Sequence, residues 1–313
     1  VAQLKGLNRA FVAQGLKVMS ARRNDGLNAL ASAARLNRAP TCSDLGFALG
    51  PRINAGGRVG KSDLGVRLLT TADPEEARLI AQELDRLNEE RRAIEAQVQE
   101  AAEAAMATQH NRAVALVSGE GWHPGVIGIV AGRIKQKFGK PAIVVAVDAD
   151  GTGKGSGRSI SGVDLGAAII SAREAGLLVA GGGHAMAAGL TIEAGKIDAL
   201  SEWLDERLAG DVSRASSDKF LSIDAMVNPR GLSPMLIEAL EAAGPYGTGW
   251  PGPRVVTGPV RIVKCDIVGK DHVRADLELE ELRAHALRRA GAGGGVGELA
   301  GIRLGVRHQL LQC

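Results

Sequence analysis

The run Gly181-Gly182-Gly183-His184, followed by small residues up to Gly189, has the residue types that best suit binding of an anion. Three consecutive glycines carry no side chains, so their backbone amides can approach a ligand closely. The segment 185–188 could begin a helix, and helix N-terminal amides favour negative charge. The pattern predicts a phosphate site with His184 beside it, and a tight turn between two buried segments is the alternative.

A second glycine-rich string, residues 155–159, could bind the same kind of ligand. Arg158 lies there between Ser156 and Ser159, so a guanidinium and two hydroxyls can donate hydrogen bonds to phosphate oxygens. A surface arginine beside a β-turn is the alternative interpretation.

A third string places Arg52 and Arg58 six residues apart in a segment of glycine, proline and asparagine, which reads as a loop over 50–60. We interpret both arginines as contacts to a nucleic-acid backbone, and packing between helices or domains is the alternative. His123, next to Pro124, suits either a substrate contact or a structural role.

Positive charge is concentrated near the start of the chain. Residues 1–61 hold ten Lys or Arg against two Asp, a local excess of +8, although the whole chain carries only +3. Such a segment attracts polyanions, with an affinity that falls as salt rises, unless it is simply a solvated helix face.

Composition excludes several classes of protein. The chain has no apolar run of 18 residues and no signal peptide, so we expect a cytoplasmic protein without membrane partners. Its three cysteines are far apart and match neither a zinc site nor a disulfide framework. Aromatic residues make up 3%, which argues against binding mainly by base stacking. Since the chain does not begin with Met, we expect it to start inside a larger protein.

The clearest single element is a long helix. Asp73 can cap its start, Pro74 suits the first turn, and two glutamates follow. Apolar residues then recur at helical spacing, which predicts one helix over 74–106 that bridges two domains. A coiled coil is disfavoured because the apolar stripe is short and Arg91 interrupts it.

Strands and helices alternate after residue 113 and predict an α/β domain. The expected strands are 114–117, 141–147 and 155–160, and the expected helices are 126–138, 164–175 and 196–208. Asp148-Ala149-Asp150 is interpreted as a hairpin turn and not as a metal site. A polar linker is expected at 213–218, followed by strand-like segments at 220–227, 255–268 and 272–277 and a helix at 234–243. Two helices broken at 24–26 are expected before residue 36.

Three of these motifs occur in the order found in the RecJ exonucleases of the DHH/DHHA1 phosphoesterase superfamily, which the chain resembles from residue 1 to about 275. The Gly-Gly-Gly-His run resembles the DHHA1 signature, and Pro-Arg-Ile-Asn-Ala-Gly-Gly-Arg resembles a string specific to RecJ. The resemblance implies the end of a DHH domain at 1–72, a connecting helix at 73–108, a DHHA1 domain at 109–212 and an oligonucleotide-binding (OB) β-barrel at 218–313.

The resemblance also implies the site residues. His184 would act in catalysis by donating to the scissile phosphate, with a satisfied structural histidine as the alternative. The implied phosphate-binding residues are Arg52, Asn54, Arg58, Ser156, Gly157, Arg158, Ser159, Gly181, Gly182, Gly183 and Gly189.

The family activity implied is 5′ to 3′ removal of nucleotides from single-stranded DNA in recombination and repair, with Mn²⁺ or Mg²⁺. An Asp-His-His triplet is not found, so the metal ligands are expected upstream, and this chain is expected to bind DNA weakly without cutting it. The implied partners are single-stranded DNA, a single-stranded-DNA-binding protein and recombination helicases. An oligoribonucleotide or cyclic-dinucleotide phosphodiesterase and a non-catalytic DHHA1 module remain alternatives.

The sequence departs from the RecJ pattern at two places. Trp250 stands where asparagine is usual. After residue 277 a Leu/Ala/Arg/Glu stretch at 278–290, with a helical pattern, and a glycine run replace the expected barrel strands, which suggests a reading-frame change and an incomplete barrel.

Overall fold

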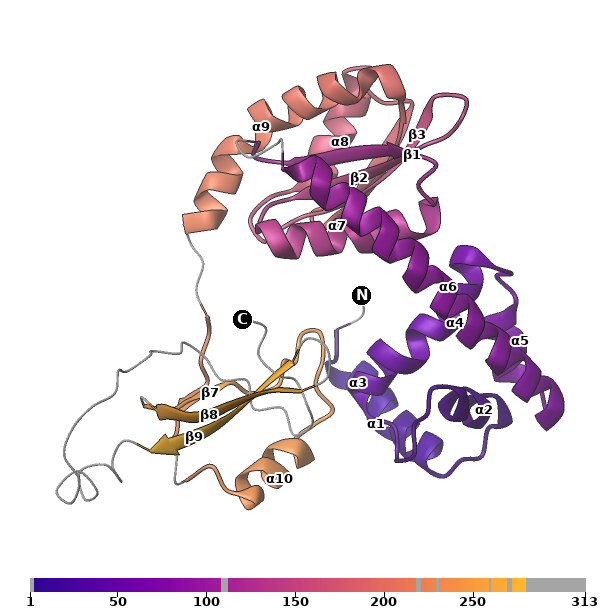
Figure 1. Cartoon of the computed structure of the whole chain (residues 1–313), viewed down its shortest axis with the longest axis vertical. Coiled ribbons are helices and arrows are strands. Elements are labelled where there is room, and N and C mark those ends of the chain that lie inside the picture. The colour runs from indigo at the N-terminus through magenta and orange to yellow at the C-terminus, as the bar shows by residue number, and fades with distance from the viewer. Residues whose placement is uncertain are drawn as a thin grey trace. The chain divides into compact units, whose positions relative to one another are not determined.

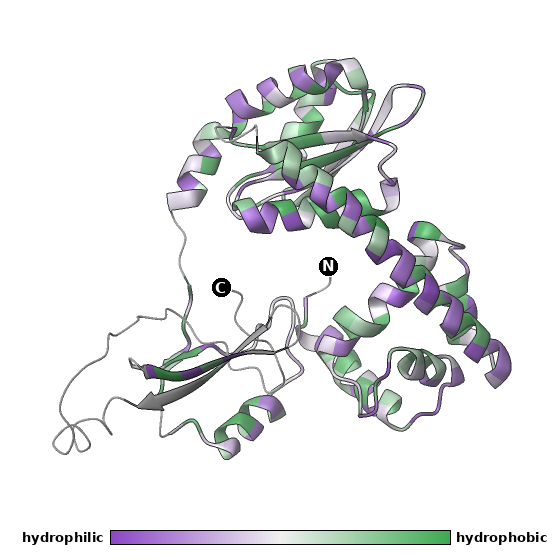
Figure 2. Cartoon of the chain, viewed as in Figure 1, coloured by the Kyte–Doolittle hydropathy of each residue, from purple (hydrophilic) through white to green (hydrophobic). Residues whose placement is uncertain are grey.

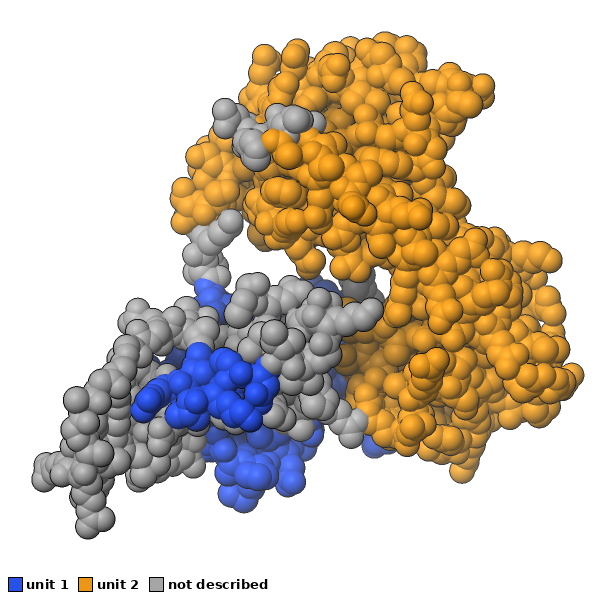
Figure 3. Space-filling view, in the orientation of Figure 1, with its two compact units in different colours: residues 1–17, 220–313 blue, residues 18–219 orange. Residues whose placement is uncertain are grey.

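The computed structural model of the chain describes residues 3–107, 112–217, 221–228, 231–258, 260–268 and 272–279. The longest helix among these residues begins at Pro74, directly after its capping residue Asp73. The chain divides into a large unit, residues 18–219, and a small unit, residues 1–17 with 220–313 (Figure 3). The helices are α1 (Gly6–Ser20), α2 (Asp25–Ala33), α3 (Cys42–Asp44), α4 (Gly50–Val59), α5 (Leu64–Thr70), α6 (Pro74–Met106), α7 (Pro124–Phe138), α8 (Leu165–Glu174), α9 (Ile197–Ser217) and α10 (Pro234–Ala242), with a π-helical turn at Leu45–Leu49 and a 3₁₀ turn at Ala194–Lys196.

The strands form one larger sheet and two small ones (Figure 1). The larger sheet has the order β1-β2-β3-β5-β4, in which β1 and β2 are parallel and the other neighbours antiparallel. The strands are β1 (Ala115–Glu120), β2 (Ala142–Val147), β3 (Thr152–Arg158), β4 (Ala180–His184), β5 (Ala187–Glu193), β6 (Ala225–Met226), β7 (Val255–Val256), β8 (Val260–Val268) and β9 (His272–Leu279).

Helix α6 has the bounds predicted from the sequence, and it contributes to two cores. The Asp73 side chain accepts a hydrogen bond from the Glu75 amide at the helix start. The first half of α6 buries Leu84 and its neighbours against α2, α4 and α5. The second half buries Val98 and Ala102 against α7 and the sheet. One helix therefore connects the helical and α/β parts of the large unit.

The larger sheet is covered by helices on both faces. Helices α6 and α7 pack on the face of Ala142 and Val144, and α8 and α9 pack on the face of Ile143 and Val145. Strand β2 is buried along its whole length, as the predicted apolar strand requires. Figure 2 shows that hydrophobic and hydrophilic residues alternate along the helices that cover this sheet.

Two glycine-rich segments differ from their predictions. Residues 50–59 form helix α4, where a loop was predicted, because Ala55 and Gly56 are buried against α6 and Gly56 allows the close approach of Leu84. The Gly181–Gly189 stretch forms the hairpin β4–β5, where a turn and a helix start were predicted, because β5 pairs along its whole length with β3. The linker predicted at 213–218 was also wrong up to Ser217, where α9 ends.

The turn between β2 and β3 confirms the prediction that Asp148-Ala149-Asp150 is a solvated hairpin turn. Asp148 Oδ1 accepts hydrogen bonds from the amides of Asp150 at 3.1 Å and Thr152 at 2.8 Å. Both aspartates are exposed. The Asp148 carboxylate therefore closes the turn.

In the small unit, β6 pairs in parallel with β7, and β8 pairs antiparallel with β9. The described residues do not form a closed barrel. Arg9 donates hydrogen bonds to the carbonyls of Ala243 and Gly244, and its guanidinium lies 5.8 Å from the centre of the Trp250 ring. The helix predicted for 278–290 lies outside the described residues except for its first two positions, which belong to β9.

No helix in the described part of the chain is long and apolar enough to cross a membrane.

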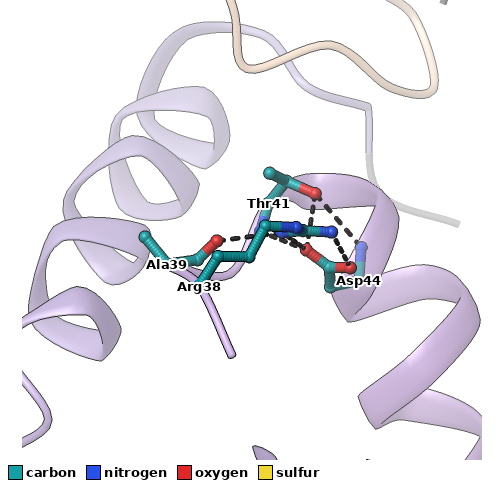
Figure 4. Close-up of polar contacts among 4 residues, drawn as sticks. All are labelled: Arg38, Ala39, Thr41 and Asp44. Carbon is teal, nitrogen blue, oxygen red and sulfur yellow. Dashed lines mark hydrogen bonds and ion pairs between the residues drawn. The ribbon is translucent and has the colours of Figure 1, made fainter. Parts of the chain in front are cut away.

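A buried carboxylate organises the segment before α4 (Figure 4). Arg38 donates to both oxygens of Asp44, at 2.5 and 2.7 Å, and the amide and hydroxyl of Thr41 donate to Asp44 Oδ2 at 2.7 Å. Burial by itself would raise the pKa of Asp44, but the hydrogen bonds from Arg38 and Thr41 outweigh burial and hold that pKa below its ordinary value.

We expect Asp44→Asn to lower the free energy of unfolding at pH 7 by about 1–3 kcal/mol, because the bidentate ion pair and the cap are lost together. The lowered pKa means that the carboxylate stabilises the fold above its unfolded pKa and stops doing so as pH falls through its folded pKa. Urea unfolding between pH 7 and pH 2 should show the two proteins converging at the acid end. A constant gap would contradict this assignment.

Candidate functional site

Three strands place polar and glycine residues in two rows on one face of the larger sheet. Arg158 of β3 pairs with Ala187 of β5, which pairs with His184 of β4. Directly paired residues in an antiparallel sheet point to the same face, so Arg158 and His184 lie on one side, two strands or roughly 10 Å apart. In the next row on this face, Ser156 pairs with Gly189 and Gly189 with Gly182. Five of the predicted site residues therefore come together.

The two glycines form an open floor beside Ser156, next to the row of Arg158 and His184. A β-carbon built on Gly182 would have no neighbour within 4 Å, and one built on Gly189 would meet only the Gly155 carbonyl oxygen, at 4.0 Å. Neither residue has the positive φ that favours glycine. Since neither packing nor conformation requires glycine here, the bare backbone is available for close approach by a ligand.

The other glycines predicted to bind phosphate are explained by packing, because a side chain at these positions would collide with neighbouring atoms. A β-carbon on Gly157 would lie 2.7 Å from Leu165 Cδ2, and one on Gly181 would lie 2.8 Å from Ile169 Cγ2. A β-carbon on Gly183 would collide with the Ala187 carbonyl oxygen. These three glycines alternate with the open-face residues and allow the sheet to pack tightly on its α8 side and within the hairpin.

Ser159 does not fulfil its prediction as a phosphate ligand. It is fully buried, and its hydroxyl donates to the Val163 carbonyl oxygen at 2.8 Å. Its amide donates to the Met186 carbonyl oxygen. Both donors are thus committed to holding the end of β3 in place.

Arg158 is a partly buried cation on this face. Its Nη1 donates to Ser156 Oγ at 3.1 Å and to the Gly157 carbonyl oxygen at 2.7 Å. Burial lowers the pKa of Arg158, and the nearby Arg58 guanidinium lowers it further. Within the described residues no carboxylate pairs with Arg158, so its charge is available to an external anion.

Arg58, at the end of α4, lies against the start of α7 and near Arg158. Arg58 Nη1 donates to the Gly125 carbonyl oxygen at 2.9 Å, and Gly125 lacks the β-carbon that would collide with the backbone of Arg58. One turn further along α7, a β-carbon on Gly128 would lie 2.9 Å from Arg158 Nη2 and 3.0 Å from Ser156 Oγ. The helix start thus lies against both the α4 end and the β3 end.

The two histidines near these rows have different roles. His123 caps α7, since its Nδ1 accepts a hydrogen bond from the Gly125 amide at 3.0 Å. His184 is exposed, and its Nδ1 accepts from the Met186 amide at 3.3 Å. When Nδ1 accepts, the ring proton lies on Nε2, which is left to donate to a ligand.

Arg52 does not join this cluster. Its Nε donates to Asp85 Oδ1 at 2.7 Å and its Nη1 to the Ala48 carbonyl oxygen at 2.8 Å, and only 13% of its side chain is exposed. It therefore holds α4 to α6, which corrects the prediction of a DNA contact. Asn54 is exposed and, with Arg58, lines a pocket between α4, α6 and α7.

The described residues contain no group of three or more His, Cys, Asp or Glu that could hold a metal ion. The rows described above offer hydrogen-bond donors, positive charge and bare backbone. They therefore suit binding of a phosphate and do not suit binding of a divalent cation.

Sequence reasoning missed the polar cluster at the middle of α6. Glu95 is buried between Arg91, which donates to its Oε2, and Arg133 of α7, which donates to its Oε1 at 2.6 Å. Arg91 also donates to Asn88 Oδ1. The signal was present in the sequence, because Arg91 interrupts the apolar stripe where the first core ends and the second begins.

Comparison with known proteins gives two domain matches. Residues 95–210 match the DHHA1 domain family, and residues 223–290 match the RecJ OB domain family. The second match ends at residue 290, beyond the point near residue 277 where the sequence was expected to depart from the RecJ pattern.

Whole-chain comparisons agree with the domain matches. The chain is 37% identical over 297 residues to a Dickeya dadantii (strain 3937) protein named single-stranded-DNA-specific exonuclease RecJ, covering 89% of this chain and 50% of the relative. It resembles the crystal structure of Thermus thermophilus RecJ in complex with Mn²⁺, with a TM-score of 0.74, 29% identity and coverage of 89% of this chain and 41% of that one. It also resembles the crystal structure of Thermus thermophilus RecJ in complex with Mg²⁺, with a TM-score of 0.73, 29% identity and coverage of 89% of this chain and 43% of that one.

The chain spans about half the length of the curated relative it matches. Its DHHA1 and OB matches follow one another in the order that the motifs predicted. The chain belongs to the RecJ family of the DHH/DHHA1 superfamily.

Proposed function

We propose that this chain supplies the phosphate-binding part of a RecJ-type exonuclease that removes nucleotides from single-stranded DNA in the 5′ to 3′ direction, in recombination and repair. The observation that carries the proposal is that Arg158 and an exposed His184, on either side of Ala187, share one sheet face with the adjacent row of Ser156, Gly189 and Gly182. Such a surface can receive the backbone of one strand at close range, with cations beside its phosphates.

Each residue has a distinct part in this proposal. Arg158 and Arg58 bind a phosphate through guanidinium groups, and Ser156 adds a hydroxyl. His184 Nε2 donates to an oxygen of the scissile phosphate and stabilises the charge that develops there. Gly157, Gly181 and Gly183 position these groups from the packed side of the strands.

Hydrolysis itself requires groups that the described residues do not provide. We propose Mn²⁺ or Mg²⁺ as the cofactor, as in the two Thermus thermophilus crystal structures, with ligands from outside the described residues. The proposal also includes a cytoplasmic location and contacts with a single-stranded-DNA-binding protein and recombination helicases. The domain limits proposed are 1–72, 73–108, 109–212 and 218–313.

We expect the purified chain to bind a 5′-phosphorylated single strand of about 20 nucleotides with a Kd of roughly 1–100 μM at moderate salt, because phosphate contacts dominate such binding. It should release no nucleotides when Mn²⁺ or Mg²⁺ is added. Fluorescence anisotropy measures the binding, and chromatography of the labelled strand measures release. Metal-dependent release by the chain alone would refute the division of roles.

The matched variants are Arg158→Ala and Arg214→Ala. Arg158→Ala should weaken binding roughly 10- to 100-fold, since a charge-assisted contact is lost. Arg214→Ala removes the same charge from the exposed end of α9 and should leave affinity within about twofold. Equal effects of the two variants would refute the site.

A further inference from the structure

A second positively charged site lies next to the proposed phosphate site in the large unit. It is a pocket of about 580 Å³ between the turn before α4, α4 itself, α6 and α7. That volume is within the range of small-ligand sites. The pocket is lined by Phe47, Asn54, Arg58, Arg92, Glu95 and Arg133, together with Arg91.

The pocket carries an excess of positive charge. Four arginines line it, at positions 58, 91, 92 and 133, against the single carboxylate of Glu95, so the lining sums to 4 − 1 = +3. Glu95 is shared by Arg91 and Arg133. Arg92 is exposed and has no partner among the residues described. The lining therefore favours an anion over a neutral ligand.

One wall of the pocket is aromatic and accessible. Phe47 is 76% exposed, and it lines the pocket together with Pro51 and Ile129. An accessible aromatic ring beside guanidinium groups suits a nucleotide, because the base can stack on the ring while the phosphate meets the cations.

Arg58 connects this pocket to the phosphate site. The Arg58 side chain lines the pocket, and its positive charge lowers the pKa of Arg158. On α7, Gly125, Ile129 and Arg133 are four residues apart, so they follow one helix face from the Arg58 contact into the pocket. A DNA strand bound at Arg158 and Arg58 would therefore extend along this helix face towards Phe47 and Arg92.

We propose that this pocket is a second nucleotide subsite, which binds a further nucleotide of the same single strand by stacking its base on Phe47 and pairing its phosphate with Arg92 and Arg133. This inference rests on the proposed function, because it continues the path of the strand held by Arg158.

The test compares two ligands, the 5′-phosphorylated dinucleotide of thymidine and the corresponding dodecamer. Phe47→Ala should weaken dodecamer binding roughly 5- to 100-fold and leave dinucleotide binding unchanged, and Phe47→Trp should bind as the parent does. Arg92→Ala should weaken dodecamer binding and reduce the slope of log K against log salt by about 0.7. Phe138→Ala and Arg86→Ala are the controls, since both side chains lie outside the pocket in the large unit.

The outcomes separate the two proposals. If Arg158→Ala weakens binding of both ligands while Phe47→Ala and Arg92→Ala change neither, the subsite is refuted and the proposed function stands. Equal losses of dinucleotide and dodecamer binding in the pocket variants would also refute a separate subsite. If the parent chain does not bind the dodecamer, or Arg158→Ala has no effect, the proposed function fails first.

Discussion

Glu95→Ala is expected to lower the free energy of unfolding of the large unit by about 3–5 kcal/mol. The Glu95 side chain is 5% exposed, and it is the carboxylate that balances Arg91, whose side chain is 9% exposed. Without Glu95, the Arg91 guanidinium stays buried with only Asn88 as a partner, and Arg133 of α7 loses its contact with α6. Removing one member of a buried pair leaves a charge without compensation, which is the costly case.

Glu103→Ala is the matched control for this prediction. Glu103 also joins α6 to α7, through Lys137, but 24% of the Glu103 side chain and 56% of the Lys137 side chain are exposed. Solvent screens that pair, so its loss should cost less than about 1 kcal/mol. Urea unfolding can be followed by Trp122 and Trp203 in a Trp250→Phe background. Equal shifts in the two variants would show that Glu95 has no special role.

The long helix could be predicted closely because its signals are local. Asp73 and Pro74 fix the start, and the apolar spacing continues to Met106. Local signals were insufficient at 50–60, where a proline and several glycines suggested a loop. The helix that forms there depends on burial of Ala55 and Gly56 against α6, which no local pattern encodes.

This difference decides the roles of the two arginines in α4. In a loop, Arg52 and Arg58 could both face the same ligand. In a helix, six residues rotate the side chains to about 120° apart. Arg52 accordingly points to Asp85 of α6, and Arg58 points to the start of α7. Their spacing was visible in the sequence, but the assignment required the helix.

The phosphate site was predicted by residue type and only partly by position. Glycine runs give no indication of which residue faces solvent, because the alternation of a strand depends on its partners. Strand β5 inserts between β3 and β4, which is a non-local pairing. That pairing separates Gly182 and Gly189, on the open face, from Gly157 and Gly181, on the packed face.

Valine substitutions at Gly189 and Gly157 should therefore have opposite effects. Gly189→Val should fold as well as the parent or gain up to about 1 kcal/mol, because its side chain enters open space in a strand and valine favours strands. The same side chain would stand on the floor beside Ser156 and Gly182, so single-stranded DNA binding should fall at least about 100-fold, towards the limit of detection.

Gly157→Val should instead lower the free energy of unfolding by about 1–3 kcal/mol, since its β-carbon would lie 2.7 Å from Leu165 and 3.3 Å from Ile143 in the core. At temperatures where it remains folded, it should keep most of its affinity, because the new side chain points away from the open face. Thermal unfolding and anisotropy on the same samples measure both quantities. If Gly189→Val bound DNA like the parent, single-stranded DNA would not lie on the bare backbone of that face. The open-face glycines of β4 and β5 would then need another explanation.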